Sequence, residues 1–194
     1  YPPFSPAYDE ADNALYPYNL DTAKQMLADA GFADGFEFTV VSPNGFPQLG
    51  QFAQILQADL KTIGVTMNIE PMDNAQWYPI LNGGTYQSTF SFAGGSQMYP
   101  TRIAGSSMFA PADNTVWANG TPPAAYVDAM HQADTTLDPD AQKTSFQQMT
   151  KAFLDEAWAH PIAFKYTIFG STSSVSGIDH GVYDQIRVDS ATKS

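Results

Sequence analysis

The stretch FEFTVVSPNGFPQLGQFAQILQADLKTIGVTMNIEPM, residues 36–72, decides the fold class of this chain. Its first part, residues 36–43, is rich in β-branched and aromatic residues and predicts a strand. Residues 46–64 then carry apolar side chains at helical spacing and end at Gly64, and residues 65–72 alternate as a second strand. A strand, a long helix and a second strand make a βαβ unit, which predicts parallel strands joined by a right-handed crossover.

Further elements extend this unit on both sides. The other expected helices are residues 19–31, 73–84, 122–137 and 138–158, and the other expected strands are residues 85–92 and 160–171. We expect Asn19, Asp73 and Asp138 to cap three of these helices and Gly31 to end the first. The side chains expected to point inward from the last two helices are Tyr126, Ala129, Met130 and Ala133, and then Phe146, Met149, Phe153, Leu154 and Ala157. The side chains expected to share one face of the strand over residues 85–92 are Tyr86, Ser88, Phe90 and Phe92. Pro79 lies past the first turn of its helix, where a proline removes a backbone donor, so we expect a kink or an early end there. The fold class predicted by this order is α/β, with a mixed sheet flanked by helices.

Composition excludes several classes of function. The chain has 194 residues, is 43% hydrophobic and carries 20 acidic against 8 basic residues, with a net charge of −12. The Lys and Arg residues form no cluster, which argues against nucleic acid and anionic membranes as partners. There are no cysteines, so disulfides and thiol chemistry are excluded. No run of residues is long and apolar enough to span a membrane, and residues 1–19 do not resemble a signal peptide.

Catalytic and metal-binding motifs are also missing from the sequence. The chain has no nucleophile elbow, no phosphate-binding loop and no His-x-x-x-His pair. His131, His160 and His180 are far apart and lack the spacing of metal ligands. We therefore expect neither a cofactor nor a metal, and we expect no enzyme activity.

One segment, FSFAGGSQMYPTR over residues 90–102, begins like a strand and continues as a loop. It can be a packed surface loop, or it can contact a ligand, because ligands of open α/β sheets lie beyond the carboxyl ends of the strands. Trp77 and Trp158 are better explained by core packing, whereas Trp117 lies in an irregular segment and is the best ligand contact of the three tryptophans. Tyr78 and Tyr99 also offer flat stacking faces.

Four blocks of sequence, in this order, resemble the extracytoplasmic solute-binding proteins of ABC importers, specifically the peptide-type family 5. They are residues 16–43, 51–77, 81–95 and 135–166. The resemblance implies one lobe of the type II periplasmic-binding-protein fold, with a missing N-terminal lobe as its partner. It also implies that residues 1–18 connect to that lobe, that 19–175 form the C-terminal lobe, and that 176–194 return toward the hinge.

The same resemblance implies a function and a set of site residues. A periplasmic or otherwise extracytoplasmic protein would close its two lobes on a small solute, such as a peptide, a sugar or an amino-acid derivative. The closed form would then dock on an ABC permease. The expected ligand-binding residues are Phe92, Gly94, Gly95, Ser96, Met98, Tyr99, Arg102 and Trp117.

The chain departs from the peptide-binding pattern in one respect. Peptide-binding members carry an aspartate in this loop that pairs with the α-amino group of the ligand, and residues 95–102 contain no acid. This departure disfavours an ordinary free peptide as the solute. Arg102 can hold a carboxylate in a bidentate pair or can be a solvated surface residue.

Two other classes of function stay open at this point. A hydrolase or transferase domain could use carboxylates such as Asp73 and Asp113, and a close pair of cleft carboxylates with raised pKa values would favour it. A freestanding interaction module is the other alternative, and the native mass and scattering of the intact protein would separate it from a lobe.

Overall fold

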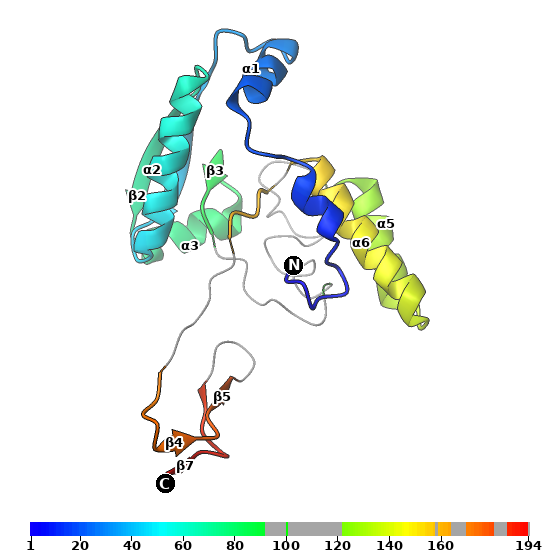
Figure 1. The fold of residues 1–194 in the computed structure, drawn as a ribbon. Coiled ribbons are helices and arrows are strands. Elements are labelled where there is room, and N and C mark those ends of the chain that lie inside the picture. The colour runs from blue at the N-terminus through cyan, green and yellow to red at the C-terminus, as the bar shows by residue number, and fades with distance from the viewer. Residues whose placement is uncertain (92–99, 101–121, 158, 164–169, 181–185, 194) are drawn as a thin grey trace. The chain divides into compact units, whose positions relative to one another are not determined.

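The structure, a computed structural model, describes residues 1–91, 100, 122–157, 159–163, 170–180 and 186–193 (Figure 1). The chain divides into two compact units, residues 1–159 and residues 160–194. Among the described residues, no helix combines the length and the apolar character needed to cross a membrane.

A parallel sheet forms the centre of the first unit. Its strands are β1 (Glu37–Pro43), β2 (Thr66–Met72) and β3 (Ser88–Thr89), in the order β2-β1-β3. β1 pairs in parallel with both neighbours, and α2 (Pro47–Thr62) connects β1 to β2. The predicted βαβ unit with parallel strands is therefore confirmed.

Two helices cover opposite faces of this sheet, which α2 flanks in Figure 1. Neighbouring residues of a strand point to opposite faces, so Val40 and Val41 belong to different cores. Val40 packs with residues of α2 in one cluster, made of Val40, Leu49, Ala53, Met67 and Phe90. Val41 packs with residues of α3 (Asn74–Gly83) in the other, made of Val41, Met72, Trp77 and Leu81. The result is a three-layer α/β arrangement.

Three of the predicted helix caps are confirmed. The side chains of Asn19, Asp73 and Asp138 accept a backbone N–H in the first turn of α1 (Leu20–Asp29), α3 and α6 (Pro139–Asp155), respectively. Each bond satisfies a donor that would otherwise lack an intrahelical partner. Gly31, with φ of 88°, terminates α1 as predicted.

Of the two outcomes expected at Pro79, the early end of the helix is wrong, and the kink stays a prediction. α3 continues through Pro79 to Gly83 and ends at Gly84, which has the left-handed conformation with φ of 63°. Trp77 and Leu81, on either side of the proline, are 3% and 4% exposed. Their burial against the sheet stabilises the helix enough to outweigh the hydrogen bond that Pro79 removes.

The prediction for residues 85–92 is also corrected. β3 comprises only Ser88 and Thr89. Tyr86 packs against the cluster under α3, whereas Phe90 belongs to the cluster under α2, so these two residues do not share a face. The alternation of side chains holds only where a paired neighbour fixes the pleat, and here the pairing spans two residues.

α5 (Ala124–Thr135) and α6 are adjacent helices of a helical hairpin (Figure 1). The predicted inward residues of α5 are all buried: Tyr126, Ala129, Met130 and Ala133. On α6, Phe146 and Met149 are buried as predicted. Ala157, expected on the same stripe, is exposed, because α6 ends at Asp155 and Ala157 has a positive φ of 49°.

The N-terminal segment packs on this hairpin. It contains a short 3₁₀ helix, η1 (Glu10–Ala14). Gln147 Nε2 donates to the carbonyl of Tyr8 at 3.0 Å, and Thr150 Oγ1 lies 3.2 Å from the carbonyl of Ala7. Ala7 is fully buried with Ala133 and Phe146. These contacts fix the first residues of the chain against α6.

The described residues of the second unit form two short antiparallel pairs. β4 (Val175–Ser176) pairs with β7 (Thr192–Lys193), and β5 (Asp179–His180) pairs with β6 (Ile186–Arg187). The strand expected over residues 160–171 is wrong for residues 160–163 and 170–171, and its middle lies outside the described residues. Those described residues join no β-ladder, and an apolar alternation forms a strand only where a neighbour supplies the hydrogen bonds.

Candidate functional site

The three parallel strands deliver three chain segments to one edge of the sheet. We name this edge the carboxyl edge and define it by residues 44–45 after β1, 73–74 after β2 and 90–91 after β3. Parallel strands place their carboxyl ends on the same side, and ligands of open α/β sheets bind there. The segment that the sequence singled out as a ligand loop leaves the sheet at this edge.

A chain of hydrogen bonds fixes the end of β3. Trp77 Nε1 donates to Thr89 Oγ1 at 2.9 Å, and Thr89 Oγ1 lies 3.0 Å from the carbonyl of Val41. Trp77 is 3% exposed, so its N–H is shielded from water and depends on Thr89 as its acceptor. This contact ties α3, β3 and β1 together immediately before the predicted ligand loop begins.

The first two segments of the carboxyl edge contact each other closely. The Asn44 N–H donates to the carbonyl of Met72 at 2.9 Å, which joins the end of β1 to the end of β2. A Cβ on Gly45 would lie 2.9 Å from Asn74 Nδ2, so only glycine fits against this amide without a shift. Asn74 Oδ1 is buried and has no hydrogen-bond partner among the residues that the structure describes. The edge is therefore tightly packed and lined by amide groups.

The eight predicted ligand-binding residues lie outside the described residues: Phe92, Gly94, Gly95, Ser96, Met98, Tyr99, Arg102 and Trp117. Their role stays a prediction. The sequence did not single out Asn44, Gly45 or Asn74, which the fold brings together at the same edge. The signal for them is positional, since each follows directly after a predicted strand of the βαβ unit.

The aromatic residues beside the edge fall into two groups. Trp77 is buried, which confirms its predicted packing role. Tyr78 is 49% exposed, and its ring centroid lies 4.9 Å from that of Trp77. Tyr78 thus has an exposed ring supported by a buried indole, and its face stays a candidate for stacking. Trp158 lies outside the described residues.

The carboxylates considered for catalysis do not form a described pair. Asp73 Oδ1 accepts the N–H of Gln76 at 2.9 Å as the cap of α3, and Asp113 lies outside the described residues. Burial, followed by repulsion from Asp9, raises the pKa of Asp12, but Asp12 belongs to η1 and not to the carboxyl edge. Within the described part of the chain, no group of three or more acidic or histidine side chains is placed to hold a metal ion.

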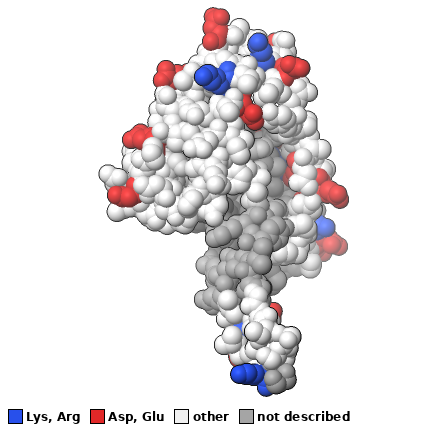
Figure 2. Space-filling view, turned by 60° about the vertical axis from the view of Figure 1, so that its left-hand side comes forward, with Lys and Arg blue, Asp and Glu red and all other residues white. Residues whose placement is uncertain are grey.

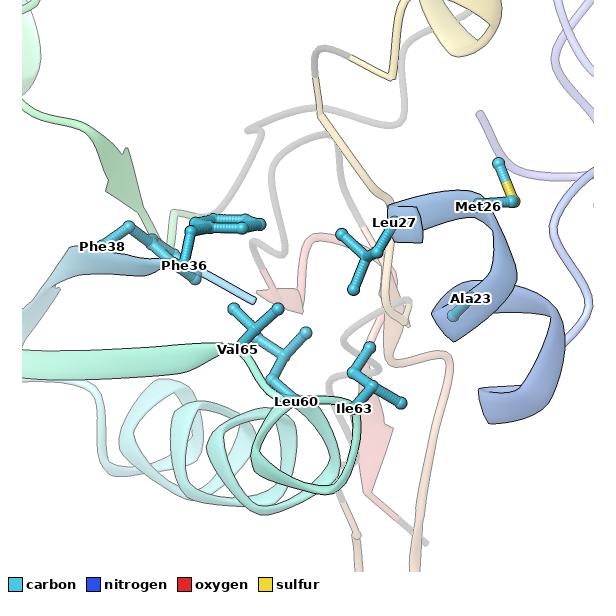
Figure 3. Close-up of a pocket in the computed structure, with 8 residues that line it drawn as sticks. All are labelled: Ala23, Met26, Leu27, Phe36, Phe38, Leu60, Ile63 and Val65. Atoms are coloured by element: carbon cyan, nitrogen blue, oxygen red, sulfur yellow. The ribbon is translucent and has the colours of Figure 1, made fainter. Parts of the chain in front are cut away.

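An apolar hollow of about 420 Å³ lies near the amino ends of β1 and β2 (Figure 3). Eight residues line it, and all are apolar: Ala23, Met26, Leu27, Phe36, Phe38, Leu60, Ile63 and Val65. They come from α1, from the start of β1 and the residue before it, and from the end of α2 and the link to β2, as the sticks in Figure 3 show. A polar solute needs convergent donors and acceptors, which this lining lacks. The carboxyl edge is therefore the better candidate site.

The distribution of charged side chains argues against a polyanionic ligand. On the face drawn in Figure 2, acidic side chains are scattered and the few basic ones form no broad patch. The net charge of the whole chain is −12. A polyanion such as nucleic acid requires clustered Lys and Arg side chains, which the drawn face does not present.

Comparison with known proteins places these observations in a family. Residues 1–117 match the model of the bacterial extracellular solute-binding proteins, family 5 Middle. No curated protein sequence matches the chain.

Several solved structures are similar in fold. "Clavulanic acid biosynthesis oligopeptide binding protein 2" has a TM-score of 0.82 and 16% identity, with 100% of this chain and 38% of that chain covered. A dipeptide-binding protein from Pseudoalteromonas sp. SM9913, in complex with Met-Leu, has a TM-score of 0.72 and 20% identity, covering 100% and 39%. The periplasmic binding protein MelB from Agrobacterium fabrum C58, in complex with stachyose, has a TM-score of 0.63 and 21% identity, covering 78% and 27%.

These similarities confirm the predicted type II periplasmic-binding-protein fold. The chain spans less than two fifths of the length of each of these structures. Because the family model covers residues 1–117 of 194, this chain belongs to the bacterial extracellular solute-binding proteins of family 5.

Proposed function

We propose that this chain forms most of one lobe of a two-lobed protein that binds a solute for uptake by an ABC transporter. The observation that carries the proposal is the carboxyl edge, where three parallel strands deliver three segments to one side of the sheet. The predicted ligand loop starts from this edge, and the family match covers the strands that form it.

The mechanism proposed is binding followed by closure, without chemistry. A solute would contact the carboxyl edge of this lobe and the facing surface of an N-terminal lobe, and closure would exclude water from both. In this account, residues 1–18 and 176–194 connect the lobe to its partner, and the closed form docks on an ABC permease. The protein would act outside the cytoplasm, as the name of its family indicates.

The solute is expected to be a small molecule of the peptide, sugar or amino-acid-derivative class. One structural relative binds the dipeptide Met-Leu and another binds stachyose, so the fold accommodates both kinds of ligand. The lack of an acid over residues 95–102 disfavours a free peptide with an α-amino group. We therefore place sugars and amino-acid derivatives first in any screen.

Thermal-shift screening of the intact protein tests the proposal. Oligosaccharides, dipeptides and amino-acid derivatives are added singly, and each is also assayed for consumption. We expect one class of solute to raise the unfolding temperature without being turned over. A ligand that binds only the native state stabilises that state. Turnover of a substrate with no stabilisation by any solute would favour the hydrolase or transferase alternative instead.

A further inference from the structure

The described chain contains two Asn-Gly pairs in contrasting settings. Asn44–Gly45 lies in the turn between β1 and α2, and Asn82–Gly83 lies in the last turn of α3. Both asparagines are exposed. Glycine after asparagine leaves the following backbone nitrogen sterically accessible, so each pair is open in principle to attack on the asparagine side chain.

The backbone of the two pairs differs in a way that matters for this attack. Around Asn44, the Asn44 N–H donates to Met72 and the Phe46 N–H donates to Pro43, whereas the Gly45 N–H donates to none of the described residues. The Asn44 side-chain amide likewise makes no hydrogen bond with a described residue. Gly83, in contrast, is inside α3, where backbone N–H groups donate to the carbonyls four residues earlier.

We propose that Asn44 is a deamidation site at the carboxyl edge. The deprotonated Gly45 nitrogen attacks Cγ of Asn44 and forms a C–N bond. The side-chain nitrogen leaves as ammonia with the proton that the backbone gave up, and a cyclic succinimide remains. Water then opens either carbonyl of the succinimide, which leaves aspartate or isoaspartate at position 44. No redox partner or cofactor enters this sequence of steps.

The product places a new negative charge at a particular point of the fold. α2 begins at Pro47, and its N-cap, Phe46, provides no side-chain hydrogen bond. A carboxylate at position 44 lies just before the positive end of this helix, which favours negative charge. It also adds a second carboxylate to an edge where Asp73, the cap of α3, is the one charged residue among residues 44–45, 73–74 and 90–91.

The consequence for ligand binding rests on the proposed function, whereas the modification itself does not. If the carboxyl edge contacts the solute, deamidation disfavours an anionic solute and favours a cationic one. In the aspartate product the change is confined to the side chain of one residue that precedes α2, so the sheet and its two cores need no rearrangement, whereas the isoaspartate product also lengthens the backbone at position 44.

Peptide mapping by mass spectrometry tests the proposal on the full chain. Purified protein is incubated in native buffer at mildly alkaline pH, and aspartate and isoaspartate are quantified at positions 44 and 82 over time. We expect position 44 to convert several-fold faster than position 82. The matched control is Asn44→Gln, which should abolish conversion at position 44 and leave position 82 unchanged. A synthetic peptide spanning residues 40–49 reports the rate without the fold.

Each outcome decides the proposal. Equal rates at the two positions would overturn it, and so would a position 44 that is stable in the protein while the peptide converts. If position 44 converts, an Asn44→Asp variant then tests the consequence separately. Unchanged affinity of that variant for a confirmed charged solute would remove Asn44 from the ligand-contacting edge, while the modification site would stand.

Discussion

Trp77 Nε1 donates a hydrogen bond of 2.9 Å to Thr89 Oγ1, which joins the buried face of α3 to the last residue of β3. The contact connects two elements that are adjacent in sequence but have different roles. One covers the sheet, and the other releases the predicted ligand loop. The position of that loop therefore depends on the packing of α3.

Thr89→Val should reduce the free energy of unfolding by about 1–3 kcal/mol, because it leaves the buried Trp77 N–H without its acceptor. Valine keeps the branched shape that suits a strand. Urea unfolding measures the change. In a double-mutant cycle with Trp77→Phe, we expect a coupling of about 1 kcal/mol, whereas strictly additive losses would contradict the role given to this bond.

Gly35→Ala should be strongly destabilising. Gly35 has a φ of 77°, and a Cβ on it would lie 1.8 Å from the carbonyl oxygen of Gly64. We expect a loss of about 2–4 kcal/mol from backbone strain and overlap together. Urea unfolding again measures it.

Gly31→Ala is the matched control. Gly31 has a φ of 88°, but nothing lies within 4 Å of the added Cβ. Strain alone should cost about 1–2 kcal/mol there. If the two variants lose equal stability, the close approach of Gly35 and Gly64 does not constrain the entry into β1.

Pro79→Ala should stabilise the protein by about 1–3 kcal/mol, because it restores a hydrogen-bond donor inside α3. Pro139 occupies the first position of α6, where the missing N–H has no intrahelical acceptor. Pro139→Ala should therefore change stability little. Unfolding of both variants in urea compares them, and a loss of stability in Pro79→Ala would show that the proline has a packing role that the helix geometry does not reveal.

Asp12→Asn should stabilise the protein at neutral pH. In the folded protein, burial raises the pKa of Asp12, and repulsion from Asp9 raises it further. A raised carboxyl pKa means that the folded state binds the proton more tightly than the unfolded state does. Its contribution to stability is therefore largest below the ordinary carboxyl pKa and is lost as the pH rises through the raised value.

Thermal unfolding across the acidic range tests this sign. The Asp12→Asn variant should lose less stability than the wild type as the pH rises from acidic to neutral. Asp134→Asn removes one exposed charge from α5 and controls for the change in net charge. Identical pH profiles for Asp12→Asn and the wild type would contradict the account.

Local sequence signals predicted most of the first unit. Caps at Asn19, Asp73 and Asp138, together with the apolar stripe on α5, were sufficient because each is a property of a few neighbouring residues. The stripe expected on α2 is confirmed at Leu49 and Ala53 but is wrong at Leu56, which is 39% exposed. The errors came where non-local packing decided the outcome. Burial of Trp77 and Leu81 stabilises α3 on both sides of Pro79, so the helix continues past the proline. The pairing of β3 spans only two residues, and Tyr86 and Phe90 pack into different clusters.

The candidate site was less accessible to sequence reasoning. The strand order that brings residues 44, 74 and 90 to one edge depends on pairing between distant segments, which periodicity does not encode. The approach of Gly45 to the Asn74 amide is of the same kind. The loop residues themselves, from Phe92 to Arg102, rest on the resemblance to family 5 and stay a prediction.

A calorimetric titration tests the central claim most directly. The intact protein and its Tyr99→Ala variant are titrated with the solute that gives the largest thermal shift. The account predicts saturable binding of one solute per wild-type chain and at least several-fold weaker binding by the variant, with unchanged unfolding in urea. Absence of binding heat for every solute, or equal affinity of the wild type and the variant, would contradict it.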